Sequence, residues 1–300
     1  MSAYPSFSVR SRAFVALSLV CFFWGTTWIA TKEGVKHMPA IQLAGLRQSI
    51  GGCLYLLYFL GRRFALPKGR EWWPVLVLSL LNFVLTNGLT TLGLKFINAG
   101  LGAIIAAIFP LWIVVIGLFR DSKLPPVKAI VGLLLGFAGI CIIFYDHLHD
   151  FLNNEFRLGI ILSLIASWTW AFGTLYTKSE ATKFNPYFSI GLQMLISGVV
   201  MTAIAVLSDS AIPVVDIPWQ SWAAILYLAF FGSVISFLAY LYALQHLPTE
   251  QASIYAYINP VVAVLSGFLI YGESLTIYLA VGGVVILYGV YLVNKVYRKL

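Results

Sequence analysis

Charged residues are scarce in this sequence. Only 10% of its 300 residues are Asp, Glu, Lys or Arg, whereas 60% are apolar. A soluble globular domain carries roughly a quarter charged residues. The composition therefore excludes a soluble protein and predicts an integral membrane protein whose main partner is the lipid bilayer.

Cysteine and histidine are scarce as well. The three cysteines, Cys21, Cys53 and Cys141, stand alone within apolar runs, without the paired spacing of a disulfide or a metal site. We interpret them as small core residues. The four histidines fall in loops or at helix ends, so the sequence predicts no metal site and no cofactor.

Catalytic and nucleotide-binding motifs are absent too. The chain contains no H-E-x-x-H, G-x-S-x-G or Walker sequence, which argues against an intramembrane enzyme and against an ATP-driven pump. No small-x-small cleavage site follows the first apolar run, so we expect this run to be retained as a helix.

Ten apolar runs of helical length make up most of the chain. A bilayer core of ~30 Å needs about 20 apolar residues in a helix, and the alternating segments of a membrane β-barrel do not occur. We therefore predict an all-α integral membrane protein with ten transmembrane helices, at roughly 13–31, 39–60, 72–94, 98–119, 127–145, 158–177, 186–207, 220–245, 250–270 and 277–294.

The sequence contains the same pattern twice. Sliding it by 150 residues superimposes Leu94 on Leu244 and keeps the register as far as Gly139 on Gly289. Such a match across two apolar runs and the loop between them indicates internal duplication, and a duplicated membrane protein is a candidate transporter.

The duplication reaches the first helix of each half, where an offset of 146 residues pairs Trp24 with Trp170, and one inserted residue then brings Pro39 onto Pro186. Each copy holds five spans, so the second copy enters the membrane from the opposite side. The result is an inverted repeat around a central cavity. We predict an N-terminal tail, a first repeat, a second repeat and a C-terminal tail at 1–12, 13–150, 151–294 and 295–300.

The net charge of +8 is unevenly distributed along the chain. Only Lys32, Lys36, Lys95 and Arg157 fall in loops on the side opposite the N-terminus. The positive-inside rule then places both termini in the cytoplasm, at the inner membrane, and no nucleic-acid partner is needed to explain the charge. The basic residues predicted inside are Arg10, Arg12, Arg62, Arg63, Lys68, Arg70, Arg120, Lys123, Lys128, Lys178, Lys183, Lys295, Arg298 and Lys299.

Arg47 is the sole formally charged side chain clearly inside a predicted span. A central arginine costs roughly 2.5–3.5 kcal/mol on insertion scales, so it needs a partner or water. Two interpretations stay open. Arg47 either contacts an anion or carboxylate in a cavity, or it links helices through backbone carbonyls or a loop carboxylate.

Polar residues form a stripe along the third span. Ser79, Asn82, Thr86 and Thr90 follow one another at steps of three, four and four residues, with Asn87 beside them. Such a stripe in a membrane helix either lines an aqueous path or binds neighbouring helices. We interpret it as a path.

The eighth span carries an equivalent stripe, because the offset of 150 residues places Ser236 on Thr86 and Tyr240 on Thr90. Two symmetry-related stripes are what a shared central cavity requires. The residues predicted to form the substrate path are therefore Arg47, Asn82, Thr86, Asn87, Thr90, Ser236 and Tyr240.

Prolines and glycines mark the remaining spans. Pro110 and Pro260 lie near the middles of the fourth and ninth spans, where each frees a carbonyl four residues upstream. These kinks are either architectural or the bending points of alternating access. The fifth and tenth spans are rich in glycine, which favours packing within one half over a dimer face. We expect a monomer or a weak homodimer.

Two stretches resemble a known family, "WGTTWIATK" in the first span and, above all, "ALQHLPTEQASIYAYINPVVAVLSGFLIYGESLT" near the end. They resemble the EamA-domain permeases of the drug/metabolite transporter superfamily, and the resemblance covers essentially the whole chain as two tandem EamA repeats. It implies ten helices in two inverted five-helix repeats, with a central cavity formed chiefly by the third, fourth, eighth and ninth helices.

Two departures limit what the resemblance implies. The Gly-Glu pair usual after the fourth helix is present in the second copy as Gly272-Glu273, but Asp121-Ser122 stands in the first. The small multidrug-resistance relatives also use a carboxylate within their first helix. Here the nearest is Glu33, at the outer end of the span, so their proton-for-cation exchange is not implied.

The sequence thus predicts a secondary transporter that exports amino acids or related zwitterionic or anionic metabolites by alternating access. A multidrug or cation exporter of the same fold is one alternative. A non-transporting membrane scaffold or sensor is another, although it would not need matched polar stripes in both halves.

Overall fold

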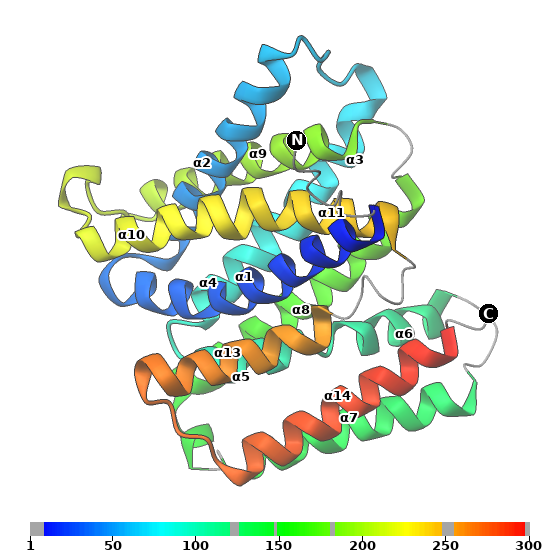
Figure 1. Ribbon diagram of the computed structural model, residues 1–300. Helices are drawn as coiled ribbons and strands as arrows, with labels where there is room; N and C mark the ends of the chain where they lie inside the picture. Colours follow the sequence, from blue (N-terminus) through cyan, green and yellow to red (C-terminus); the bar gives the residue numbers. More distant parts are fainter. Residues whose placement is uncertain (1–8, 121–125, 147–148, 181–183, 248–254, 298–300) are drawn as a thin grey trace, which may run out of the picture.

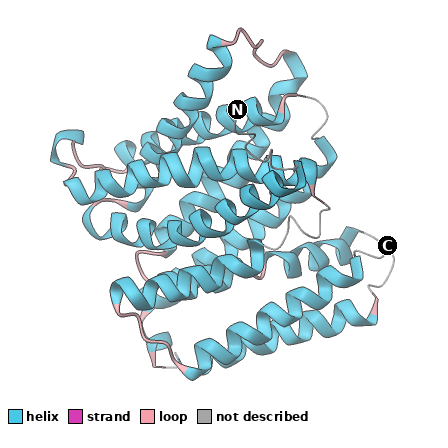
Figure 2. Ribbon diagram, viewed as in Figure 1, coloured by secondary structure: helices cyan, strands magenta, loops and turns pink. Residues whose placement is uncertain are grey.

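The computed structural model describes residues 9–120, 126–146, 149–180, 184–247 and 255–297. These ranges are helical and contain no strand (Figure 2). Six helices are long and apolar enough to cross a membrane, and four shorter apolar helices complete the ten predicted spans. The prediction of an all-α membrane fold built from two repeats is confirmed.

Each half of the chain contributes five spans. Those of the first half are α1 (Val9–His37), α2 (Ala40–Gly61), α3 (Trp72–Leu78) with η2 (Ser79–Asn87) and α4 (Gly88–Gly93), α5 (Ala99–Ala106) with α6 (Phe109–Arg120), and α7 (Val127–Asp146). Those of the second half are α8 (Asn154–Glu180), α9 (Pro186–Leu207), α10 (Trp219–Tyr227) with η5 (Leu228–Ile235) and α11 (Ser236–His246), α13 (Tyr255–Tyr271) and α14 (Ile277–Tyr297). Three short 3₁₀ helices lie in the connections: η1 (Gly69–Glu71), η3 (Asp150–Leu152) and η4 (Val214–Asp216).

Helices of the two halves pack in symmetry-related pairs. Helix α2 packs along α9, and α7 packs along α14 at the lower edge of the view in Figure 1. Gly198 of α9 faces Ser49 of α2, and Gly52 of α2 faces Leu195 of α9. The two contacts are equivalent, because an offset of 146 residues relates Gly52 to Gly198 and Ser49 to Leu195. The packing therefore pairs the helices at that offset.

This offset corrects the alignment predicted for the two prolines. Pro39 precedes α2 as its N-cap residue, whereas Pro186 is the first residue of α9. The offset within the helices pairs Arg47 of α2 with Gln193 of α9. The offset of 146 residues that relates Trp24 to Trp170 thus continues through the second span, and the inserted residue predicted between them is wrong.

The glycines of α7 and α14 let these two backbones approach closely. A Cβ atom at Gly132 would lie 2.6 Å from the carbonyl oxygen of Gly289, and one at Gly139 would lie 2.7 Å from that of Gly282. Small residues allow such contacts in membrane helices. The glycines were expected to pack within one half, but they join the two halves.

The third and eighth spans each contain a π-helical segment at equivalent positions, η2 and η5. The Thr86 hydroxyl donates to the Leu81 carbonyl over 2.7 Å, and the Ser236 hydroxyl donates to the Phe231 carbonyl over 2.6 Å. Both bonds reach back five residues, which is the register of a π-helix. Such segments often occur at functional sites.

The two symmetry-related prolines behave differently. Pro260 lies within the continuous helix α13. The fourth span is instead interrupted after α5, and Pro110 is the second residue of α6. Proline is tolerated in the first turn of a helix, where its missing N–H has no intrahelical partner. The kink predicted at Pro110 is therefore a break between two helices.

Glu273 connects the two halves at one end of the bundle. It follows Gly272, whose φ of +62° suits the left-handed conformation that glycine adopts readily. The carboxylate accepts hydrogen bonds from the backbone N–H groups of Ala99 at 3.0 Å and Gly100 at 3.3 Å. It thus binds the N-terminus of α5, where a negative charge is favourable. The corresponding Asp121-Ser122 of the first copy lies outside the described residues.

We expect Glu273→Ala to lower the thermal stability of the detergent-solubilised protein, because a lost helix cap costs about 1 kcal/mol. Glu273→Gln should have a smaller effect, since its amide oxygen can still accept one of the two bonds. Asp216→Ala, which removes an exposed carboxylate from η4, serves as the control. Equal melting temperatures for Glu273→Ala and the control would contradict the capping role.

Candidate functional site

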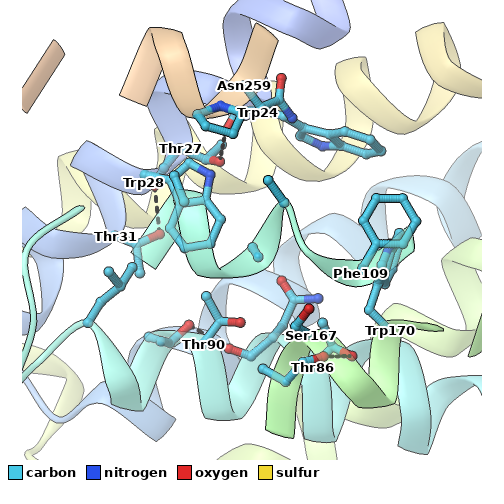
Figure 3. Close-up of a pocket in the computed structure, with 18 of the residues that line it drawn as sticks. Trp24, Thr27, Trp28, Thr31, Thr86, Thr90, Phe109, Ser167, Trp170 and Asn259 are labelled. Carbon is cyan, nitrogen blue, oxygen red and sulfur yellow. Dashed lines mark hydrogen bonds between the residues drawn. The ribbon is translucent and has the colours of Figure 1, made fainter. Parts of the chain in front are cut away.

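A cavity of about 180 Å³ lies between the two halves (Figure 3). Its walls come from α1, α2, η2, α4, α5 and α6 of the first half and from α8, α11 and α13 of the second. Most of the lining residues belong to the first half. The cavity is therefore central but unequally shared.

The structure brings four of the predicted path residues together at this cavity, namely Arg47, Thr86, Asn87 and Thr90. Pro260 lines it as well, as do Ala106 and Ala256, the residues four positions before the two prolines. Asn82, Ser236 and Tyr240 do not line it.

These three residues are engaged elsewhere. Asn82 packs against Gly173, where a Cβ atom would overlap its amide. Ser236 is fully buried and donates its hydroxyl to its own helix. The ring of Tyr240 packs against Trp24 and Tyr255, with centroid distances of 5.3 Å in both cases.

The π-helical segments explain why the predicted stripes do not follow one wall. Steps of three and four residues keep side chains on one face only in an α-helix. A π-helix bonds from residue i to i+5, so each of its turns holds more residues. In the third span, Asn82 within η2 and Thr90 beyond it consequently lie on different faces, and Thr90 alone of the two lines the cavity.

Tryptophans form much of the cavity wall, and the sequence analysis did not place them at the site. Trp24 and Trp28 come from α1, and Trp170 comes from the equivalent part of α8; Figure 3 shows them around the cavity together with Phe109 of α6. The repeated Trp24 and Trp170 were taken as a sign of duplication. Their recurrence was also the available signal that the first helix of each half reaches the site.

Most hydroxyls at the cavity are bound to backbone. Thr27 donates to the Trp24 carbonyl at 2.6 Å, and Thr31 donates to the Thr27 carbonyl at 2.7 Å. The buried Ser167 hydroxyl is different, since it has no partner among the described residues. Ser163, one turn earlier on the same helix, donates its hydroxyl to the Gly159 carbonyl at 2.9 Å. Ser167 thus adds an unused hydrogen-bonding group to the lining.

Among the described residues that line the cavity, Arg47 supplies the single formal charge, and none is a carboxylate. The side chain is 8% exposed, and its Nε donates to the Ser233 hydroxyl at 3.2 Å. Within the described residues, both ion pairs involve Glu33, and none involves Arg47. Arg47 is therefore a link between α2 and η5 through Nε, whereas its terminal nitrogens have no described protein partner.

Glu33 lies away from the cavity, at the end of α1. Its carboxylate accepts from the Tyr271 hydroxyl at 2.5 Å and pairs with Lys36 at 2.9 Å. Lys32, one residue earlier, donates to the carbonyls of Leu94 at 2.8 Å and Ile97 at 2.7 Å. These contacts join α1 to α13 and to the end of α4, and no carboxylate in the described ranges pairs with Arg47.

We expect Thr90→Cys to react with a small water-soluble thiol reagent, because Thr90 lines the cavity. Ser236→Cys should be inert, because that position is buried outside it. Both variants are made in a background without Cys21, Cys53 and Cys141, and reaction rates are followed by mass spectrometry. Equal rates at the two positions would show that the cavity does not admit the reagent.

Comparisons with known proteins agree with this architecture. The model of the EamA-like transporter family matches residues 11–145 and 157–295. A crystal structure with 19% sequence identity superimposes with a TM-score of 0.68, over 97% of this chain and 100% of that one, and therefore has the same fold.

Curated relatives point the same way. The uncharacterized inner membrane transporter YedA of Escherichia coli is 32% identical, over 88% of this chain and 84% of its own length. The uncharacterized transporter YvbV of Bacillus subtilis is 27% identical, over 95% of this chain and 92% of its own length. This chain is therefore a multi-pass inner membrane protein with two such repeats. It belongs to the EamA-like transporter family.

Proposed function

We propose that this protein is a secondary transporter that exports amino acids or related zwitterionic or anionic metabolites by alternating access. The observation that carries the proposal is the charge of the cavity. Arg47 lines it, and no carboxylate does within the part of the chain that the structure describes. A substrate that brings its own carboxylate neutralises a charge that is costly to leave unpaired in a membrane.

The chemistry of the walls fits such a substrate. The guanidinium of Arg47 offers a planar fork that matches a carboxylate. The indoles of Trp24, Trp28 and Trp170 offer apolar surface, and their faces attract an ammonium group. The unpartnered hydroxyl of Ser167 adds a polar contact.

Size and charge also separate this proposal from its alternative. Drug-sized ligands occupy pockets of roughly 300–1,000 Å³, and this cavity has about 180 Å³. A lipophilic cation would meet the fixed charge of Arg47 with no carboxylate to bind. Both observations favour a small metabolite over the cationic drugs of a multidrug exporter.

The repeat architecture supports alternating access. In transporters built from inverted repeats, the substrate site lies at the repeat interface, and one part of the molecule rocks against the other around it. Here the cavity lies between the halves, and the interrupted fourth span borders it through Ala106, Ala107 and Phe109. The break between α5 and α6 is a suitable bending point.

The cytoplasmic location of both termini is part of the proposal. Helix α1 begins and α14 ends at the same end of the bundle (Figure 1). The connection that contains Arg62, Arg63 and Lys68 follows two successive spans, α1 and α2, and therefore returns to the side of the N-terminus, as expected for a cytoplasmic face under the positive-inside rule.

Counterflow in proteoliposomes tests the role of Arg47, with the substrate chosen by a thermal-shift screen of amino acids, nucleosides, sugar phosphates and organic cations. Arg47→Gln should lower uptake about tenfold or more, since a lost charged hydrogen bond costs about 1.5–3 kcal/mol. Arg47→Lys should retain part of it, because the charge remains without the planar fork.

Gln193→Met provides a matched control, because Gln193 occupies the position equivalent to Arg47 and does not line the cavity. Its transport should remain near the parental rate. A well-folded Arg47→Gln protein that moves carboxylated substrates at the parental rate would remove Arg47 from the site. Absence of counterflow with every compound of the screen would favour a scaffold or sensor.

Membrane orientation is tested by labelling introduced cysteines in intact cells with an impermeant reagent. Phe64→Cys and Leu152→Cys are suitable because both side chains are exposed in short connections. Leu152→Cys should be labelled from outside, and Phe64→Cys only after the cells are opened. Labelling of both from the same side would contradict five spans per repeat.

A further inference from the structure

The Arg47 side chain rests on the π-helical segment of the opposite half. Its Nε donates to the hydroxyl of Ser233, which is completely buried in η5. The residue before it, Gly232, has no side chain, and a Cβ atom there would lie 3.0 Å from Nη2 of Arg47. Gly232 and Ser233 together form a seat for the guanidinium.

Neighbouring contacts fix this seat against the first half. The indole of Trp24 donates to the Gly232 carbonyl at 3.0 Å, and the hydroxyl of Tyr55 donates to the Val234 carbonyl at 3.2 Å. Three successive residues of η5 thus each bind a side chain from α1 or α2. A π-helical segment changes the usual hydrogen-bond register of a helix, which leaves such groups available.

The other half has no equivalent seat. The offset of 150 residues places Ser233 on Phe83 and Gly232 on Asn82. Phe83 belongs to an apolar core cluster. Gln193, the counterpart of Arg47, bonds Ser189 at 2.8 Å and lies outside the cavity. The seat is therefore not a general requirement of packing a π-helical segment against its neighbour.

We propose that Gly232 and Ser233 are positioning residues that hold the Arg47 guanidinium with its two terminal nitrogens toward the cavity. The second half then sets the charge selectivity of a cavity lined mainly by the first. With Nε occupied by Ser233, the paired terminal nitrogens are the face left for a carboxylate, which they can bind in a bidentate manner. The substrate class in this inference rests on the proposed function, whereas the geometry around Arg47 does not.

A first experiment measures the geometry without any substrate. The reagent 2,3-butanedione reacts with both terminal nitrogens of an arginine, and peptide mass spectrometry gives the modification rate at Arg47. Ser233→Ala should slow it about tenfold, the change expected for one lost hydrogen bond to a charged group. A rate equal to or faster than the parental one would overturn the proposal.

Ser79→Ala is the matched control, because Ser79 lies in the π-helical segment of the first half and donates to the Gln193 carbonyl at 3.0 Å. In Ser79→Ala, butanedione should modify Arg47 at the parental rate. A decrease in this rate as large as that in Ser233→Ala would also overturn the proposal. If Ser233→Ala does not purify as a folded protein, Ser233→Cys keeps a side chain of similar size with a weaker acceptor, and the same slowing is expected.

A second experiment measures charge selectivity. Calorimetry gives the affinity of each standard L-amino acid and of its amide. For the amino acid that binds most tightly, the ratio of these two affinities reports recognition of the carboxylate. Gly232→Ala, whose methyl group would crowd both Nη2 and Thr27, should reduce this ratio about tenfold. An unchanged ratio in the folded variant would refute the positioning role. Absence of amino-acid binding to the parental protein would refute the proposed substrate class, whereas the butanedione result would still decide the geometry.

Discussion

Backbone polar groups have no water to bind within the hydrocarbon core of a membrane, and this constraint governs the whole structure. Continuous helices satisfy it along most of the chain. Where the helical register changes, side chains add hydrogen bonds to the backbone, as Trp24 does at the Gly232 carbonyl and Tyr55 at the Val234 carbonyl. The irregular backbone of η5 is thus tolerated because the other half of the chain binds it.

The same constraint explains how the halves are joined. In lipid there is no hydrophobic driving force between apolar helices, so close packing and buried polar contacts must hold the helices together. Gly132 against Gly289 and Gly139 against Gly282 bring two backbones together at one edge. Glu273 of the second half binds the N-terminus of α5 in the first. Each contact crosses between the repeats, and the cavity lies where neither half closes the space alone.

Apolar runs and internal repetition were sufficient to predict the fold, because bilayer thickness fixes helix length and an odd number of spans fixes the inversion. The site was only partly predictable. Arg47, Thr86 and Thr90 are polar in apolar runs, and such residues avoid lipid. Ser236 and Tyr240 were misplaced because they were predicted from their symmetry-related residues, Thr86 and Thr90, whereas the two halves share the cavity unequally. Trp28 went unnoticed because an aromatic residue facing a cavity looks, in sequence, like one facing lipid or core.

The two repeats differ at the place where the proposed selectivity arises. Equal halves suit a transporter that exchanges two related conformations, since each half can adopt the shape that the other leaves. A substrate with one carboxylate, however, needs one charge in one place. The residues equivalent to Arg47 and Ser233 in the other repeat are Gln193 and Phe83, which carry no charge. A second buried arginine at the symmetric position would add its own insertion cost and repel the first across a low-dielectric cavity. In the proposed transporter, duplication supplies the motion, and divergence at the contact between Arg47 and Ser233 supplies the charge.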